Sequence, residues 1–408
     1  MIANPLIPLD EAQTFVLSHC KPAAPVATAA HLALGLVTAE PIVSNELVPP
    51  FDNTAVDGYA VQAADTADAP TSLRVVGSIA AGDNPTMTIE PGTAARIMTG
   101  APLPAGADAV VMVEDTEADD SAGTVTISKS VELNSAVRRA GEDMTPGQTV
   151  FAPGTMVTPG HIGVLATLGI DSISTHQRPT VGVLSTGDEL VEGPQKLEPG
   201  QIRDSNRRTL LALVAQTGAT PVDLGLVADD EAAVEAALRD GASRCDALIT
   251  SGGVSMGDYD YVKLVLSRIA DMRWMQIAIK PAKPLAFGTL DGTPIFGLPG
   301  NPVSSMVSFE LFARPGLRTM LGVASNTVHR PLIRATAESP LPRRADGKTH
   351  FARVLLRWQD GQALISSAGG QGSHQLSAMA ASQALAVLPD GDGVDSGDTV
   401  NVLLVQPT

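Results

Sequence analysis

A run of small and acidic residues in the middle of the chain has the composition of an anion-binding turn. Gly252 and Gly253 directly follow an apolar stretch, and Asp258 and Asp260 come a few residues later. Glycine has no Cβ and reaches positive φ at little cost, so a Gly-Gly turn lets backbone N–H groups approach a phosphate closely. A tight connection between a strand and a helix is the alternative for the glycines alone, and the nearby acids favour a ligand site.

Two lysines and a helix start lie farther along the chain. Lys280 and Lys283 belong to the run Lys-Pro-Ala-Lys-Pro, in which the prolines restrict the backbone and hold the two ammonium groups in a preset arrangement. Pro302 follows Asn301 at the expected first position of a helix, where proline is favoured. A helix N-terminus beside fixed cations suits an oxyanion. A solvated sheet edge is the alternative for the lysines.

Carboxylates gather on the same predicted rim. Asp188 and Glu189 follow a buried strand, and Asp258 and Asp260 follow the glycine turn. Clustered carboxylates beside a phosphate site indicate Mg²⁺, which takes oxygen ligands and keeps several waters. Helix capping is the alternative for each acid taken singly. The sequence has no Cys/His spacing of a zinc site, no Walker A motif, no nucleophile elbow and no recognisable catalytic triad.

Alternating strands and helices must position these groups. We expect strands at 180–185, 221–227, 246–250, 285–288 and 293–296, and helices at 206–216, 229–239 (capped by Asp229), 260–269 and from Asn301 onward. This alternation predicts a mainly parallel sheet covered by helices. Ligands bind outside the carboxyl ends of such strands. The loops at 185–190, 250–260 and 297–302 should therefore converge in one crevice, a pocket for a large, phosphorylated, multiply charged ligand.

The flanking regions show other patterns. A helix is expected at 9–19, a short helix followed by an extended piece at 26–40, a loop of fixed shape at 49–60, and a helix at 159–168. Short strands indicate a small all-β module inserted in the N-terminal part: 73–78, 86–89, 94–98, 109–113 and 124–128. After Arg314, further short strands predict a small β-barrel or sandwich: 329–336, 349–358, 363–366, 384–388 and 399–404.

We therefore predict an α/β multidomain protein. Its central, mainly parallel α/β domain is flanked by an N-terminal mixed domain with an inserted β module and by a small C-terminal β-barrel domain. The predicted bounds are 1–50 with 143–177 for the discontinuous N-terminal domain, 51–142 for the inserted β domain, 178–325 for the central domain and 326–408 for the barrel. A chain of 408 residues is too long for one ordinary core, which agrees with several domains.

Composition limits the class of partner. Hydrophobic residues make up 44% and charged residues 17% of the chain, as in a folded protein. The net charge of −17 opposes binding to nucleic acid or to an anionic membrane, although a local cluster of lysines and N–H groups can still hold a small anion. Cys20 and Cys245 make no disulfide framework, no signal-peptide pattern is evident, and no apolar run approaches ~20 residues. We expect a cytoplasmic protein.

Seven motifs in a fixed order resemble the molybdopterin molybdenumtransferase (MoeA) family, whose eukaryotic relatives include the gephyrin and plant Cnx E domains. The motifs lie at 51–60, 99–104, 141–143, 185–190, 251–255, 280–284 and 297–304. The stretch 372–376 looks like a further motif of the C-terminal domain in this family. Each motif is modestly specific alone, and the ordered set is highly specific.

The resemblance implies an elongated homodimer of four-part subunits. In this family adenylylated molybdopterin and molybdate react, with Mg²⁺ as cofactor, to give molybdenum cofactor and AMP. The catalytic residues carried over are Asp57, Thr99, Asp143, Glu189, Asp229, Asp260 and Lys280. The first three would reach the cleft of the other subunit, so that the active site would combine two copies of the chain.

The resemblance also implies binding roles. The substrate-binding set is Ser251, Gly252, Gly253, Ser255, Lys280, Lys283, Pro299, Pro302 and Ser304. Within it Lys280, Lys283 and Ser304 match positions implicated in molybdate binding, and Lys348, Arg353 and Ser373 are further candidates. The expected Mg²⁺ ligands are Asp188, Glu189 and Asp260. Gln276 stands where some bacterial members have a lysine, which removes one cation of the family pattern.

Partners follow from the same resemblance. We expect an upstream molybdopterin adenylyltransferase as a protein partner, and neither nucleic acid nor a membrane. One alternative is a non-catalytic scaffold of the gephyrin kind, which binds peptides through the same domains. Another is an enzyme with a different nucleotide-linked pterin or nicotinamide substrate on the same α/β fold. The acids and lysines disfavour the first alternative, and the loop around Asp57 with the Lys280 pair disfavours the second.

Overall fold

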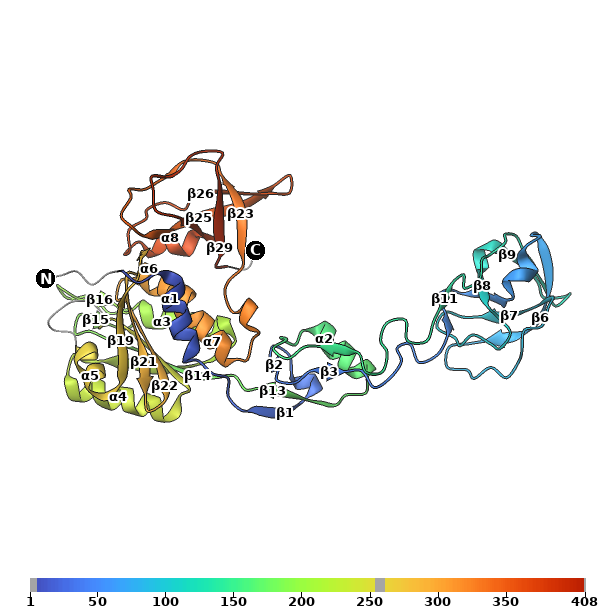
Figure 1. Cartoon of the computed structure of the whole chain (residues 1–408), viewed down its shortest axis with the longest axis horizontal. Coiled ribbons are helices and arrows are strands. Elements are labelled where there is room, and N and C mark those ends of the chain that lie inside the picture. The colour runs from blue at the N-terminus through green and yellow to red at the C-terminus, as the bar shows by residue number, and fades with distance from the viewer. Residues whose placement is uncertain (1–5, 254–260, 407–408) are drawn as a thin grey trace. The chain divides into compact units, whose positions relative to one another are not determined.

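The protein is described by a computed structural model that covers residues 6–253 and 261–406 (Figure 1). Two compact units can be separated by their internal contacts. The first comprises the described residues of Met1–Glu40, Pro153–Pro159 and Ser172–Thr408, and the second comprises Pro41–Ala152 and Gly160–Asp171. Each unit has hydrophobic clusters of its own. The bounds of the four predicted domains stay a prediction.

A six-stranded sheet forms the centre of the first unit. Its order is β17 (Thr220–Val227), β14 (Thr180–Thr186), β18 (Ala247–Ser251), β22 (Thr293–Leu298), β21 (Pro284–Leu290) and β19 (Asp271–Gln276). The first four strands are parallel, and β21 and β19 run antiparallel at one edge. The mainly parallel sheet predicted from the sequence is therefore confirmed.

Side chains alternate between the two faces of this sheet, and each face has its own core. Along β14, Val181 and Val183 join one hydrophobic cluster, and Leu184 joins another. Both faces are buried, which explains why the parallel strands read as nearly continuous apolar runs. In β22, Phe296 belongs to the first cluster and Ile295 belongs to the second.

Helices cover both faces (Figure 1). One face carries α1 (Leu9–Ser18), α3 (Asn206–Thr217), α6 (Pro302–Ser308) and α7 (Arg314–Met320), with a π-helical segment, Phe309–Ala313, between α6 and α7. The other face carries α4 (Glu231–Arg244) and α5 (Tyr261–Ile269). Buried residues of α4 recur at Val234, Leu238 and Gly241, the spacing of one helix face.

The C-terminal strands close into a barrel, as expected. Its strands are β23 (Leu332–Ala337), β25 (Thr349–Gln359), β26 (Gln362–Ser367), β27 (Ala384–Leu388) and β29 (Thr399–Leu404), and the β25–β27 pairing completes the ring. A short strand from the α/β part, β20 (Ile279–Lys280), pairs with β25. Helix α8 (Leu376–Ala381) and the small pair β24 (Leu341–Pro342) and β28 (Gly393–Val394) complete this region.

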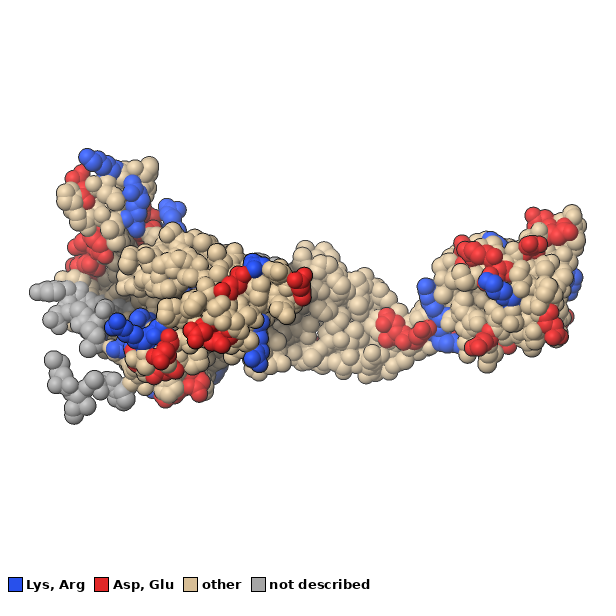
Figure 2. Space-filling view, turned by 90° about the horizontal axis from the view of Figure 1, so that it is seen from above, with Lys and Arg blue, Asp and Glu red and all other residues tan. Residues whose placement is uncertain are grey.

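The second unit contains the β module. Its sheet has the order β8 (Ala109–Met112), β5 (Gly58–Val61), β7 (Thr93–Ile97), β6 (Thr71–Ile79), β10 (Thr124–Ile127) and β9 (Thr116–Asp119). Two small pairs join β4 (Asn53–Thr54) to β11 (Val137–Arg138) and β3 (Ile42–Val43) to β12 (Thr149–Phe151). Helix α2 (Pro159–Thr167) appears where it was predicted. Acidic and basic side chains are interspersed over the visible face of the module (Figure 2).

One N-terminal prediction is wrong. The expected helix near residue 26 is the strand β1 (Pro25–Ala29), followed by a 3-10 turn, Ala30–Leu32. β1 pairs with β13 (Ser172–His176), which also pairs with β2 (Val37–Thr38). This long-range pairing overrides the local helix preference of an alanine-rich segment.

Three other predictions also need correction. The loop expected at 49–60 contains β4 and β5, and 86–89 forms no strand beyond one bridge between Thr88 and Ala105. Asp230, not Asp229, caps α4 by accepting a hydrogen bond from the Ala233 backbone N–H. Gly241 lies inside α4, and a Cβ at this position would lie 2.8 Å from Leu224 Cδ1, so glycine permits close packing of the helix on the sheet. β19 and α7 were not predicted at all.

No helix among the described residues is long and apolar enough to span a membrane.

Candidate active site

The carboxyl ends of three neighbouring strands lie level with one another. In the parallel register Ser185 is opposite Ser251, and Ser251 is opposite Leu298. The loops that follow β18 and β22 are in contact, since the Gly252 N–H donates to the Leu298 carbonyl at 3.1 Å. A Cβ at Gly300 would lie 3.7 Å from Gly252 Cα. The sheet thus brings the predicted loops to one edge.

The glycine turn has the backbone conformation expected for it. Gly252 has φ 91° and Gly253 has φ 73°, and both lie in the left-handed region that favours glycine. Ser251 is buried at the end of β18. Ser255 and Asp260, which the sequence analysis also assigned to the site, lie outside the described residues.

Sequence reasoning missed Asn206, which joins two of these loops. Its Nδ2 donates to Ser251 Oγ at 2.8 Å and to the Gly300 carbonyl at 2.7 Å. Asn206 is the first residue of α3, whose N-terminus therefore lies at the same edge. A polar Asp-Ser-Asn run directly before a helix was the available signal, since such residues mark helix starts and loop contacts.

Asp204 is a buried acid that connects β14 to α3 next to this edge of the sheet. It is 7% exposed, and its Oδ1 accepts from Ser185 Oγ at 3.2 Å and from the Arg207 backbone N–H at 3.1 Å. The Arg207 guanidinium, almost fully buried, also pairs with Asp223 and Glu192. Burial opposes the charge of Arg207, but the hydrogen bonds and charges of these carboxylates leave its pKa raised. Arg207 thus connects three acids from separate segments at the base of these loops.

Three acids gather beside β14 and β17 without a basic partner among the described side chains. The Asp229 backbone N–H donates to Asp188 Oδ1 at 3.1 Å, and the Asp188 N–H donates to Asp229 Oδ2 at 3.4 Å. Glu189 folds back over the turn, since a Cβ on Gly187 would lie 2.6 Å from its Oε2. Burial, and then the charges of Asp188 and Glu189, raise the pKa of Asp229 even though it accepts a hydrogen bond from the Asp188 backbone.

The lysine loop reaches the same edge from the antiparallel side of the sheet. Lys280 and Lys283 lie between β19 and β21, and β21 begins at Pro284 beside the end of β22. Both lysines are exposed, and the Ile277 N–H donates to the Lys283 carbonyl at 2.7 Å. Gln276, the last residue of β19, pairs with Pro284. Lys280 itself pairs with His350 of the barrel, so the loop belongs to two sheets.

Helix α6 begins at the edge as predicted, with Asn301 at the N-cap position and Pro302 at the first turn. The Asn301 side chain makes no capping hydrogen bond, which corrects the expected capping role. Pro299 and Ser304 are buried. The Val303 N–H donates to the Ser373 carbonyl at 3.1 Å and connects α6 with the loop before α8.

A buried arginine lies next to that connection. Arg353 on β25 is 0% exposed, and its Nη2 donates to the carbonyls of Gly370 (2.6 Å) and Gly372 (3.2 Å). Its Nε and Nη1 are buried and have no hydrogen-bond partner in the described structure. Burial lowers its pKa. Lys348 is instead paired with Asp346 at 2.9 Å. Two nitrogens without a hydrogen-bond acceptor on a buried cation mark a place where an anion would be stabilised.

The remaining predicted residues belong to the second unit. Asp57 Oδ1 accepts hydrogen bonds from the Thr99 backbone N–H at 2.7 Å and from Thr99 Oγ1 at 2.8 Å. These bonds lower the pKa of Asp57 and keep it ionised. Asp143 is exposed on another segment of that unit, and its N–H donates to the Val48 carbonyl at 2.9 Å. Asp57 and Thr99 are thus brought together within one unit.

Three family models match the chain. Residues 7–169 match the MoeA N-terminal region (domain I and II), residues 182–319 match the probable molybdopterin binding domain, and residues 334–405 match the MoeA C-terminal region (domain IV). Together they account for most of the chain in the order that the motifs predicted.

Known proteins show the same similarity over nearly the full length. The chain is 41% identical over 373 residues to the molybdopterin molybdenumtransferase of Haemophilus influenzae, covering 91% of each chain. It is 36% identical over 408 residues to that of Bacillus subtilis, covering 98% of this chain and 94% of the relative. The crystal structure of a molybdopterin biosynthesis MoeA protein from Pyrococcus horikoshii superposes with a TM-score of 0.83 at 28% identity, covering 98% of this chain and 100% of that one.

Proposed function

Because the chain belongs to the molybdopterin molybdenumtransferase (MoeA) family and is a transferase of molybdenum cofactor biosynthesis, we propose that it inserts molybdenum from molybdate into adenylylated molybdopterin with release of AMP. The observation that carries the proposal is the edge where a glycine turn, a lysine loop and three acids without a basic partner among the described side chains meet. A phosphoanhydride with an oxyanion beside it needs these groups: N–H donors, cations and a metal site.

We propose that these acids hold a magnesium ion together with further oxygen ligands, because no three His, Cys, Asp or Glu side chains among the described residues can hold a metal ion by themselves. Asp188 and Glu189 are exposed carboxylates without a basic partner among the described residues, and all-oxygen donor sets suit Mg²⁺. We assign these two side chains, together with the predicted ligand Asp260, to the ion. Bound there, Mg²⁺ would supply positive charge against the pyrophosphate.

The backbone and lysines account for substrate placement. Gly252 and Gly253 lie at an edge where glycine permits close backbone approach. The Gly252 N–H is already bonded to the Leu298 carbonyl, so the Gly253 N–H is the donor that we assign to a phosphate of the adenylate. Asn206 holds Ser251 and Gly300 in place around that turn. Lys280 and Lys283 supply cations for the reacting oxyanion, and the unpaired N–H groups of Arg353 beside Ser373 support an oxyanion position on the α6 side.

The exchange balances without a change of oxidation state. One oxide of molybdate attacks the adenylyl phosphorus, the bridging P–O bond breaks, and AMP leaves with that oxygen. The terminal phosphate of molybdopterin keeps the bridging oxygen. The two dithiolene sulfurs replace two oxides on molybdenum, and the second oxide leaves as water with the two thiol protons. The protein contributes mainly orientation and charge neutralisation.

We also propose that two copies of the chain form each active site. Asp57, Thr99 and Asp143 would then complete the edge of the other subunit. Asp57 is ionised and aligned by Thr99, as expected for a residue that faces a ligand. The substrate would come from a molybdopterin adenylyltransferase in the cytoplasm.

The test is AMP release from adenylylated molybdopterin, measured with and without molybdate and with and without Mg²⁺. We expect release to require both ions and to yield active molybdenum cofactor. Lys280→Ala should lower molybdate-dependent turnover while the unfolding temperature stays unchanged. Binding of the substrate without AMP release at any molybdate concentration would overturn the proposal and favour a scaffold.

A further inference from the structure

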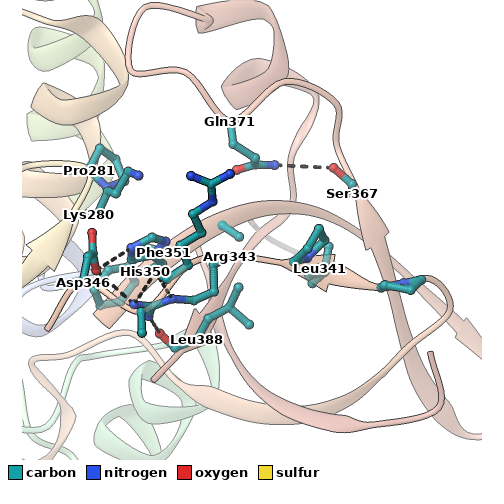
Figure 3. A pocket seen from close by; sticks show the side chains of 15 residues that line it. Lys280, Pro281, Leu341, Arg343, Asp346, His350, Phe351, Ser367, Gln371 and Leu388 are labelled. Atoms are coloured by element: carbon teal, nitrogen blue, oxygen red, sulfur yellow. Dashed lines mark hydrogen bonds and ion pairs between the residues drawn. The ribbon is translucent and has the colours of Figure 1, made fainter. Parts of the chain in front are cut away.

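Residues of the lysine loop and of the barrel together line a cavity (Figure 3). Its volume is about 640 Å³, and it lies entirely within the first unit. Figure 3 shows Lys280 and Pro281 at one end and Leu341 at the other. Because Lys280 also borders the strand-end site, a ligand held at that edge can extend into this space.

The size of the cavity suits an organic group rather than a small ion. Organic ligands occupy pockets of roughly 300–1,000 Å³. One water takes up about 30 Å³ of liquid volume, so a single tetrahedral oxyanion would leave most of the space to solvent. The cavity is therefore too large to be explained by molybdate alone.

Part of the lining is apolar and firmly held. Leu341, Phe351 and Leu388 line it and are 6%, 3% and 2% exposed, so their positions are fixed by the cores behind them. Pro281 and Pro342 add two rigid rings to the lining. Firmly held apolar side chains can contact the face of a ring system without the cost of ordering flexible groups.

The rest of the cavity lining contains charged side chains. Arg343 is neutralised, because its Nη2 donates to Asp346 at 3.0 Å and to Asp390 at 2.6 Å, and its Nη1 donates to backbone carbonyls. Asp346 is shared with Lys348 and His350. The Lys280 and Arg344 side chains have no ion-pair partner within the described part of the chain, so the lining keeps two positive charges that no described acid offsets.

We propose that this cavity binds the fused heterocyclic end of the substrate, the pterin, while the adenylate occupies the strand-end site. The inference rests on the proposed function and deepens it. A pterin has two apolar faces, polar edges and, in this substrate, a nearby phosphate. The apolar side chains of the lining would contact the pterin ring, and Lys280 and Arg344 would face its phosphate group.

Pterin-6-carboxylate, a fluorescent anionic pterin, tests the site directly on the full chain. Its binding is followed by fluorescence anisotropy for the wild type and for two variants of exposed lining residues, Ala345→Trp, which fills the cavity, and Arg344→Glu, which reverses a charge. We expect at least tenfold weaker binding for both. Ala345→Ser and Arg334→Glu, the second on an exposed strand residue outside the lining, are the matched controls and should bind like the wild type.

Competition identifies which part of the substrate is bound. Saturating AMP and saturating molybdate should each leave pterin-6-carboxylate bound. Displacement by AMP would place the ring in the adenylate site, displacement by molybdate would make the cavity an oxyanion site, and unchanged affinity in both variants would remove the pterin from this cavity. Each of these results overturns the inference.

The pterin-binding experiment and the AMP-release experiment can fail separately. If the wild type binds the pterin in this cavity but never releases AMP, the pterin site stands and the transferase reaction fails. If AMP release is normal and Ala345→Trp changes neither pterin binding nor the KM for adenylylated molybdopterin, the reaction stands and the pterin site fails.

Discussion

At the scale of single residues, the site depends on donors that hold loops together. Asn206 is the clearest case, since one amide group donates to a side chain after β18 and to a carbonyl after β22. The amide does not need to touch the reacting atoms to matter. It sets the separation of two loops that approach the same ligand from neighbouring strands.

Substitution of Asn206 should therefore impair substrate binding more than folding. Each lost hydrogen bond is worth about 1 kcal/mol, so Asn206→Ala should lower kcat/KM for AMP release about tenfold or more. Asn206→Asp keeps the shape but removes the donor, and it should be equally impaired. The change should appear in the KM for adenylylated molybdopterin, with little change in the unfolding temperature. An active Asn206→Asp variant would argue against the positioning role. Asn401→Ala, exposed on β29, serves as control.

Asp229 gives a pH-dependent prediction. Burial, and then the neighbouring charges of Asp188 and Glu189, raise its pKa above the ordinary 3.8. Protonated Asp229 thus contributes stability that is complete below pH 3.8 and is lost as the pH rises through the higher value of the folded chain. Asp229→Asn should raise the urea midpoint at pH 7, and the gain should vanish toward pH 3.8. Glu198→Gln, at an exposed acid away from Asp188 and Glu189, is the control variant. A gain that is constant with pH would contradict the assignment.

At the scale of elements, the edge hairpin of β19 and β21 carries the lysine loop. The two strands pair from Asp271 with Thr289 to Gln276 with Pro284. Gly288 makes their approach possible, because a Cβ there would lie 2.0 Å from the Asp271 carbonyl oxygen. The backbone of the neighbouring strand cannot move aside as a flexible side chain can. Residue 288 must therefore be glycine for the two strands to pair at this distance.

The same substitution should have opposite effects at two glycines. Gly288→Ala should destabilise the protein by about 1–3 kcal/mol or more and weaken molybdate-dependent turnover, because the clash separates the strands. Gly163→Ala in α2 meets no atom within 4 Å and should stabilise by about 0.5–1 kcal/mol, because alanine is the better helix former. Urea denaturation of both variants checks the signs. A stable Gly288→Ala variant would show that the hairpin tolerates separation.

Elements whose structure follows from a local sequence pattern were predicted correctly. Elements whose structure depends on pairing with a distant segment were not. The parallel strands, α3 and the helix start at Pro302 follow from apolar runs and proline placement. β1 failed because its partner, β13, is about 150 residues away. The unpaired nitrogens of Arg353 are invisible in the sequence, because they result from which carbonyls the glycine loop presents. Asn206 was readable as a helix start but not as a bridge between loops.

At the scale of the whole molecule, the proposed active site needs two copies of the chain. Asp57 belongs to the second unit and Glu189 to the first, so variants of the two residues damage different contributions to a shared site. In a twofold dimer, a heterodimer of two such variants has one site with both residues intact and one with neither.

Mixed dimers should therefore recover activity. Asp57→Asn and Glu189→Gln should each be nearly inactive alone. After co-expression, about half of the dimers are mixed and half of their sites are intact, so activity should return to about a quarter of the wild type. AMP release from the purified mixture gives the measurement, and light scattering should give twice the 42.0 kDa of the chain. No recovery in a confirmed heterodimer would mean that each chain carries its own complete site.

The pairing of Lys280 with the barrel bears on how the family can be rearranged. Ile277 bridges to Ile7, Lys280 is opposite His350 in the barrel sheet, and Pro284 already belongs to the central sheet. Within eight residues the chain thus connects the N-terminal segment, the barrel and the α/β core. The barrel is not an exchangeable appendage, because a transplanted barrel would bring a foreign strand against Lys280. Chimeras that exchange the barrel alone should keep the contacts to the nucleotide but misplace the lysines that bind the oxyanion. A working chimera should therefore exchange residues 276–284 together with the barrel.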